Sequence, residues 1–206
     1  MKPNKPLSKE EVRRHLEPYA VEIGLLTLAW NDLHDHLGQI FWGAITPQGG
    51  ISVAIWNKLS NDRTQRDLLR TAIEAGALLG RPNADRAIAD ALWLIKKVDS
   101  LAEGRNNAIH APLTTLTDIR DGTTTVAPQD HFGNRRAKNL AAKTDLLAEL
   151  GWYRECAEIL SDFSVDLTAC ISFPGAGWPW PDTPSLPPQP NQKKDGPHPG
   201  GRSRPK

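Results

Sequence analysis

The sequence predicts an all-α fold, a bundle of four to five helices with one small β-hairpin and a proline-rich C-terminal tail. Apolar residues repeat at helical spacing in three long segments, an Asp-Gly pair lies between threonine-rich runs, and prolines and glycines dominate from residue 174 onward. The 206 residues are 39% hydrophobic, with a mean hydropathy of −0.47. This composition suits one ordinary core, and we expect no membrane span because no long apolar run occurs.

A short helix is expected before the bundle. Ser8 and Glu11 have the spacing of a capping box, in which each side chain bonds the backbone N–H of the other residue. Pro18 suits the first turn of a new helix, because its missing N–H would have no partner there. We therefore expect residues 1–17 to form a separate N-terminal helix and residues 18–173 to form the bundle.

Three helices carry the apolar stripes of the bundle. The first stripe is Ile23, Leu26, Trp30, Leu33, Leu37, Ile40 and Ala44; the second is Ile88, Ala91, Ile95, Val98, Ala102, Arg105 and Ile109; the last is Leu146, Leu150, Tyr153, Ala157, Leu160, Ser164, Leu167 and Ile171. The first helix is expected to end before Pro47. The second is expected to run from a cap at Asn83 to about His110, because Pro112 disfavours helical backbone before it. The last is expected to be capped by Thr144.

A shorter helix and a hairpin complete the predicted fold. A short segment at 51–59 is followed by a helix that Ser60, Asn61 or Asp62 caps and that runs to about residue 79. Residues 113–127 form two β-prone runs joined by Asp121-Gly122, a strong hairpin signal. Because an isolated hairpin is marginal in water, it should lean on the bundle or on a second copy.

The tail at 174–206 is predicted to be disordered. It holds ten prolines and five glycines, it lacks apolar periodicity, and its five basic and two acidic residues give it a net charge of +3. Its basic end suits a solubilising terminus, or contact with nucleic acid or an acidic partner. Trp178 and Trp180 interrupt it and leave two alternatives, a docking motif or a segment that folds back on the bundle.

The two cysteines bear on the compartment. Cys156 and Cys170 lie fourteen positions apart in one predicted helix, roughly 21 Å at about 1.5 Å per residue, which is beyond disulfide reach. The first twenty residues carry charge throughout and show no apolar signal region. We therefore expect a cytoplasmic location.

The candidate site lies at the end of the second stripe. Arg105 falls in line with the buried stripe, where a charge needs a partner or an interface. Asn106 and His110 are four positions apart and share one face of the helix. A permanent cation, an amide and a titratable imidazole thus meet in the last turns, and the helix C-terminus favours the protonated imidazole.

Arg105-Asn106-Asn107-Ala108-Ile109-His110 resembles the R-x4-6-H motif of the HEPN superfamily, all-helical bundles that include many metal-independent endoribonucleases. The segment Ala29-Trp30-Asn31-Asp32-Leu33, the segment Arg66-Asp67-Leu68-Leu69-Arg70 and the hairpin after the motif are also similar to bacterial HEPN-type proteins. The resemblance covers about residues 18–172. It implies an RNase of toxin or defence type that needs no cofactor.

The resemblance also implies a mechanism. Two protomers bring their motifs together, and the 2′-hydroxyl of RNA attacks the adjacent phosphate to leave a cyclic phosphate. In that reaction His110 would transfer protons, Arg105 would clamp the phosphate, and Asn106 would orient one or the other. The implied partners are RNA, a second copy in a two-fold homodimer through the face of Arg105, and an antitoxin or other protein.

Other interpretations of the same residues stay open. The chain is alternatively a non-catalytic HEPN-like module that binds proteins or nucleic acid, or a plain bundle with a coincidental motif. Arg105 would then form a structural ion pair with Glu22 or Asp32, and His110 would cap its helix. His34 and His36 suggest a metal, but they face different sides of their helix and no third ligand has suitable spacing, so we expect no metal there.

Overall fold

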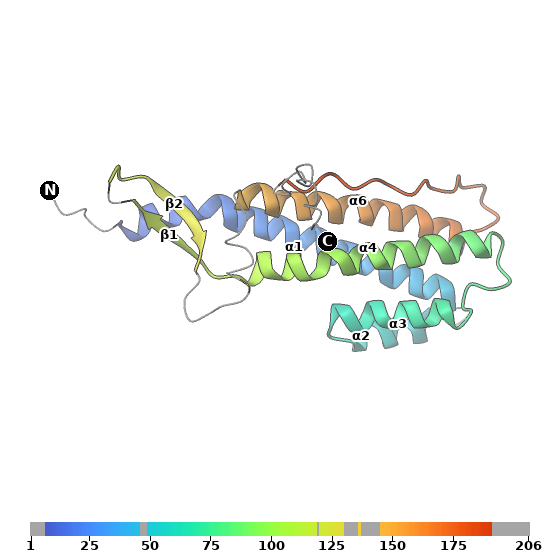
Figure 1. Cartoon of the computed structure of the whole chain (residues 1–206). Coiled ribbons are helices and arrows are strands. Elements are labelled where there is room, and N and C mark those ends of the chain that lie inside the picture. Colours follow the sequence, from blue (N-terminus) through green and yellow to red (C-terminus); the bar gives the residue numbers. More distant parts are fainter. Residues whose placement is uncertain (1–6, 46–48, 119, 130–135, 137–144, 191–206) are drawn as a thin grey trace, which may run out of the picture.

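The computed structural model describes residues 7–45, 49–118, 120–129, 136 and 145–190 of the chain (Figure 1). The elements in these ranges are α1 (Lys9–Ile45), α2 (Gly49–Lys58), α3 (Asp62–Glu74), α4 (Ala84–His110), β1 (Leu113–Thr117), β2 (Thr124–Pro128) and α6 (Leu146–Ser172). The prediction of a helical bundle with one small hairpin is confirmed. Within the described ranges, no helix has the length and apolar character needed to cross a membrane.

The expected break between a first helix and the bundle is wrong, because α1 continues through Pro18 for 37 residues. Its start is as predicted: the Ser8 backbone N donates to Glu11 Oε2 at 2.7 Å, and the Glu11 backbone N donates to Ser8 Oγ at 3.3 Å. Pro18 cannot bond the carbonyl of Arg14 one turn earlier. Both residues are exposed, so water can satisfy that carbonyl and the helix continues.

The bundle is built on α1, α4 and α6. Glu22 contacts Arg154, and Asp32 contacts Ser161, so α1 and α6 run in the same direction. Trp93 of α4 lies edge-on to Phe163 of α6, and Figure 1 shows α4 running the opposite way. The predicted stripes form much of the core between these helices. Their fully buried members include Leu26, Trp30, Leu33, Leu37, Ile40, Ile95, Val98, Leu150, Leu160 and Leu167. Leu94, outside the predicted stripes, is also fully buried.

The short helices differ from prediction mainly at their ends. Of the three candidate caps for α3, Asn61 is the one used, and its side chain accepts from the backbone N of Arg63 at 2.8 Å. The helix ends at Glu74 rather than near residue 79, because the chain turns at Gly76 with φ +96°. Asn83 precedes α4 as predicted, but it adopts φ 58° and its side chain makes no cap bond.

The start of α6 also uses a different cap. Thr144, the predicted cap, lies outside the described residues, and Asp145 accepts from the backbone N of Ala148 at 2.9 Å.

The hairpin agrees with prediction. Leu113 pairs with Pro128 and Thr117 with Thr124, and Gly122 takes φ +76° in the turn. Both strands contact α1, so the hairpin leans on the bundle.

The predicted disorder of the tail is wrong for residues 174–190, the part of it that the structure describes. Residues 176–190, here called the strap, run extended beside α6 (Figure 1). Trp180 and Leu186 pack against the core. The Trp180 indole N–H donates to Asp90 Oδ2 at 2.7 Å, and the Trp152 indole N–H donates to the Pro187 carbonyl at 2.8 Å. Of the two alternatives for the tryptophans, folding back is the one observed for Trp180.

The strap predicts unequal roles for its two tryptophans. Trp180→Ala should lower the free energy of unfolding by about 1–3 kcal/mol, since it removes buried aromatic area and the bond to Asp90. Trp178 is 61% exposed, so Trp178→Ala should change that free energy by less than about 0.5 kcal/mol. Chemical denaturation of the two variants measures both values. Equal, small effects would show that Trp180 contributes nothing to stability.

Candidate functional site

The three predicted site residues lie at the end of α4, where the helix stops as expected. The backbone turns extended at Ala111, with φ −74° and ψ 128°, immediately before Pro112. Arg105 is buried, whereas Asn106 and His110 are exposed. The structure therefore separates the motif into an enclosed cation and two solvent-facing polar groups.

Arg105 is enclosed by groups from α1 and α3. Its guanidinium carbon lies 4.8 Å from the centre of the Trp30 ring, a cation–π arrangement. Its Nη1 lies 3.9 Å from Asp62 Oδ2 and donates to Asn106 Oδ1 at 2.9 Å. Burial lowers the pKa of Arg105, and the charge of Asp62 opposes that shift. Nε is buried and makes no hydrogen bond within the described part of the chain.

The partners expected for Arg105 are wrong. Glu22 bonds Arg154 Nε at 2.6 Å, and Asp32 accepts from Ser161 Oγ at 2.7 Å, so both carboxylates serve the contact between α1 and α6. Asp62, considered in the sequence only as a helix cap, takes their place. Because α1 and α3 cover Arg105, its charge is compensated within one chain and does not require a homodimer interface on this face. The homodimer remains a prediction, but the position of Arg105 no longer supports it.

A buried histidine adjoins the same carboxylate. Asp62 Oδ2 accepts from the Trp30 indole N–H at 3.1 Å and lies 3.9 Å from His34 Nε2. Arg66 Nη1 lies 3.1 Å from the same Nε2. Because arginine only donates, Nε2 accepts and the proton of the neutral ring is on Nδ1. Nδ1 is buried without a partner among the described residues, and burial lowers the pKa of His34 to about 4.

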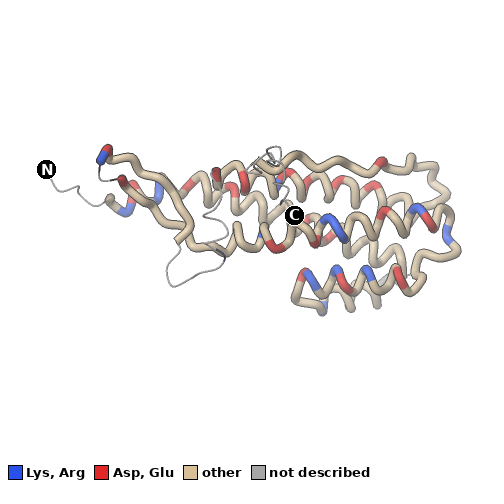
Figure 2. The backbone as a smooth tube through the Cα atoms, viewed as in Figure 1, with Lys and Arg blue, Asp and Glu red and all other residues tan. Residues whose placement is uncertain are grey.

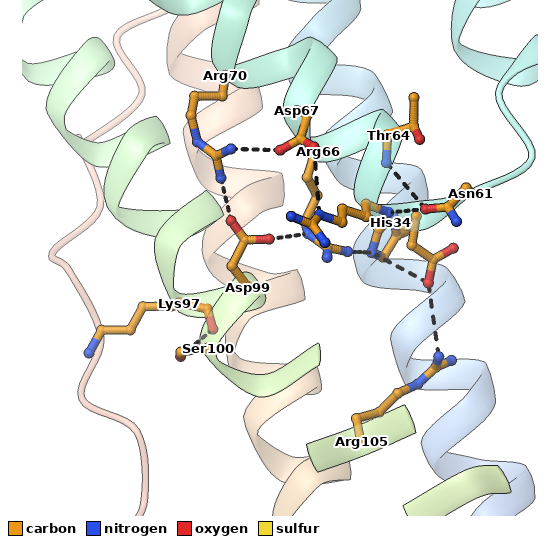
Figure 3. Close-up of polar contacts among 12 residues, drawn as sticks. His34, Asn61, Thr64, Arg66, Asp67, Arg70, Lys97, Asp99, Ser100 and Arg105 are labelled. Atoms are coloured by element: carbon orange, nitrogen blue, oxygen red, sulfur yellow. Dashed lines mark hydrogen bonds and ion pairs between the residues drawn. The ribbon is translucent and has the colours of Figure 1, made fainter. Parts of the chain in front are cut away.

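A second carboxylate ties α3 to α4. Asp99 of α4 accepts from Arg66 Nε at 2.7 Å and also from Arg70, which in turn donates to Asp67 at 2.7 Å (Figure 3). Arg66 is thus held between His34 on one side and Asp99 on the other. The close-up shows these side chains forming one continuous network from Arg70 to Arg105.

A pocket of about 730 Å³ lies between α3 and α4 beside this network. Its lining residues are Arg63, Arg66, Asp67, Arg70, Asp99, Ala102, Glu103, Asn106, Asn107 and Arg136. Four arginines thus face three carboxylates, and Figure 2 shows both signs of charge along α3 and α4. Arg63 is the most accessible of the α3 arginines: its side chain is 84% exposed, and its ion pair with Asp67 is long, at 3.9 Å.

Asn106 links the enclosed arginine to the pocket. Its amide oxygen must face Arg105 Nη1, since the guanidinium has no acceptor. Its amide nitrogen makes no hydrogen bond within the described part of the chain, and it is a donor on a residue that lines the pocket. Arg105 in this arrangement positions Asn106.

His110 lies one helical turn beyond Asn106, as the spacing predicts. It is exposed, its side chain makes no hydrogen bond to the residues that the structure describes, and it is not part of the pocket lining. The structure thus brings Arg105 and Asn106 together and leaves His110 at the neighbouring end of the helix. An exposed imidazole there remains accessible for proton transfer.

Other groups with catalytic or metal-binding potential are accounted for by the packing. No cluster of three His, Cys, Asp or Glu side chains suited to a metal occurs in the described ranges. His36 Nδ1 bonds Ser161 Oγ at 2.8 Å, and that serine is buried. Cys156 and Cys170 are both free, and burial raises the pKa of Cys156 to about 12, so its thiol is not a nucleophile.

Sequence reasoning missed the residues of α1, α3 and α4 that form the network around the motif. His34, Asp62, Arg66 and Asp99 each carry a signal, namely a polar side chain on or beside an apolar stripe. That signal identifies a side chain that needs a partner but does not identify the partner.

Comparison of the chain with models of protein families, with curated proteins and with solved structures finds no match.

The depressed pKa of His34 predicts acid sensitivity. Its ordinary pKa is 6.5 and its folded pKa is about 4, so between these values the unfolded chain binds a proton that the folded chain does not. The contribution of His34 to the free energy of unfolding is therefore full above about pH 6.5, and up to about 3 kcal/mol of it is lost as the pH drops toward 4.

The test compares pH profiles of unfolding. His34→Gln removes this titration, so its loss of stability between pH 6.5 and 4.5 should be clearly smaller than that of the wild type. His15→Gln, a change at an exposed histidine of the same helix, should leave the wild-type slope intact. Parallel profiles for wild type and His34→Gln would show that His34 titrates alike in the folded and unfolded states.

Proposed function

We propose that the chain is a HEPN-like, metal-independent endoribonuclease that cleaves RNA by attack of the 2′-hydroxyl on the adjacent phosphate. The observation that carries the proposal is the pocket, in which both asparagines of the motif lie opposite arginines of α3. Guanidinium and amide donors of this kind suit phosphate oxygens. The toxin or defence role, the antitoxin and the homodimer belong to the same proposal through the resemblance of the motif.

The roles follow from the positions of the side chains. Arg63 and the Asn106 amide nitrogen hold a phosphate at the mouth of the pocket, and Arg105 keeps that amide in place. His110 takes the proton of the 2′-hydroxyl or gives one to the leaving 5′-oxygen. The products are a 2′,3′-cyclic phosphate and a free 5′-hydroxyl, and DNA is resistant because it lacks the attacking group.

A second candidate function is supported by the enclosure of Arg105. Its side chain is only 10% exposed and faces Asp62 and the Trp30 ring, which is the environment of a structural cation. In a non-catalytic HEPN-like interaction module, the motif would serve only to stabilise the packing of the helices.

Cleavage in the presence of EDTA separates the two functions. The full chain should cut total RNA and leave cyclic phosphate ends, and His110→Ala should slow cleavage by about 10² to 10⁴, the usual contribution of acid–base catalysis. His15→Ala is the matched control on an exposed histidine and should cut normally. Arg105→Lys should also slow cleavage strongly, because lysine lacks the planar guanidinium that lies over the Trp30 ring while it donates to Asn106. RNA left intact by the wild type under every condition would favour the interaction module.

Binding tests the pocket independently of cleavage. Arg63→Gln should weaken binding of a single-stranded RNA to the His110→Ala chain several-fold and reduce the salt dependence by about one phosphate contact. Arg14→Gln removes another exposed cation, on α1, and should alter both quantities less. Fluorescence anisotropy at several salt concentrations measures them. Equal losses for the two variants would indicate general electrostatic attraction and would contradict a site in the pocket.

A further inference from the structure

The strap makes three of its directed contacts through its backbone carbonyls. Arg86 Nη2 donates to the Pro181 carbonyl at 3.1 Å, the Trp152 indole N–H donates to the Pro187 carbonyl at 2.8 Å, and Cys170 Sγ lies 3.6 Å from the Pro179 carbonyl. Donors directed at carbonyls between prolines are the usual way in which proteins recognise extended proline-rich peptides.

One side chain of the strap is recognised specifically. The Trp180 indole N–H donates to Asp90, whose side chain is only 13% exposed, and the Arg86 guanidinium lies 5.4 Å from the ring centre. Arg86 Nε also lies 3.6 Å from Asp90 Oδ2, so Asp90, Arg86 and Trp180 each contact the other two. Trp178, two residues earlier, stays largely exposed.

The far end of the strap is held by polar contact as well. The side-chain amide of Gln189 donates to Glu149 Oε1, a carboxylate with no exposed surface. The receiving residues, Arg86, Asp90, Glu149, Trp152 and Cys170, belong to α4 and α6 and are here called the strap surface.

The connection between α6 and the strap is one short turn. After α6 ends at Ser172, the Ala176 backbone N donates to the Phe173 carbonyl at 3.0 Å, and Gly177 takes φ +71°. Opening this turn disturbs few contacts, whereas every contact of the strap surface can be remade by the same segment from another chain. Exchange of identical segments is a low-cost route to a closed two-fold dimer.

We infer that the strap surface is a binding site for an extended segment containing tryptophan and proline, and that residues 176–190 of a second copy can replace the chain's own strap. The site is formed by residues of α4 and α6 outside the ribonuclease motif. The inference does not rest on the proposed function, since it is tested without RNA.

The binding arm uses a labelled peptide of residues 176–190 and the full-length Trp180→Ala chain, whose own strap is weakened. The peptide should bind saturably, and a peptide carrying Trp178→Ala should bind equally well. A peptide carrying Trp180→Ala should bind at least about tenfold more weakly, because it loses the Asp90 and Arg86 contacts. Leu186→Ala, which weakens the strap at another point, serves as a second host chain.

Two results of this arm would overturn the binding site. One is the absence of saturable binding to either host chain when circular dichroism shows that the chain is folded. The other is equal affinity for the Trp178→Ala and Trp180→Ala peptides, which would mean that the surface does not recognise Trp180.

The exchange arm measures mass by light scattering after a concentrated sample of the full chain is warmed briefly and cooled. Wild type and Trp178→Ala should form a dimer that excess wild-type peptide dissociates, and Trp180→Ala should form much less of it. A monomer at every concentration, or a dimer that ignores both Trp180 and the peptide, would overturn exchange between copies.

Discussion

The attachment of α3 to the bundle depends on two carboxylates, Asp62 and Asp99. The helix buries only two apolar side chains, Leu69 and Ile73, together with the guanidinium of Arg66. A buried cation is costly unless it is paired, and Arg66 meets Asp99 at 2.7 Å. Asp62 lies 3.9 Å from Arg105 Nη1, so each carboxylate compensates the charge of one buried arginine. The pocket exists because these pairs hold α3 beside α4.

The same network fixes the character of the motif. Arg105 is aligned with the apolar stripe of α4 and receives a ring face from α1, a carboxylate from α3 and an amide from its own helix. Three elements are thus required to position one guanidinium. His34 is kept neutral in the same place, since its Nε2 accepts from Arg66 and has no room for a proton. The site therefore combines fixed positive charge with an uncharged histidine.

Local patterns in the sequence predicted the elements well. The stripes of α1, α4 and α6, the end of α4 before Pro112 and the Asp-Gly hairpin all follow from spacing within one segment. The partner of Arg105 could not be found in this way, because Asp62 lies on another helix and no spacing rule connects them. Pro18 failed as a boundary because its surroundings are exposed. The prediction of disorder was wrong for the strap because it rested on the proline content, which does not reveal the apolar area that Trp180 buries.

The strap and the motif are supported by the same turn of α6. Gly104 directly precedes Arg105, and a Cβ at that position would lie 1.9 Å from the Tyr153 hydroxyl, so only glycine allows this approach. The Tyr153 hydroxyl donates to Glu149, and burial together with the charge of Glu149 raises the pKa of Tyr153. Glu149 also accepts from Gln189 at the end of the strap. A continuous set of contacts thus joins the C-terminal segment to the helix turn that carries the motif. Residues more than eighty positions apart in the chain, Arg105 and Gln189, are thus linked through neighbours on the same turn of α6.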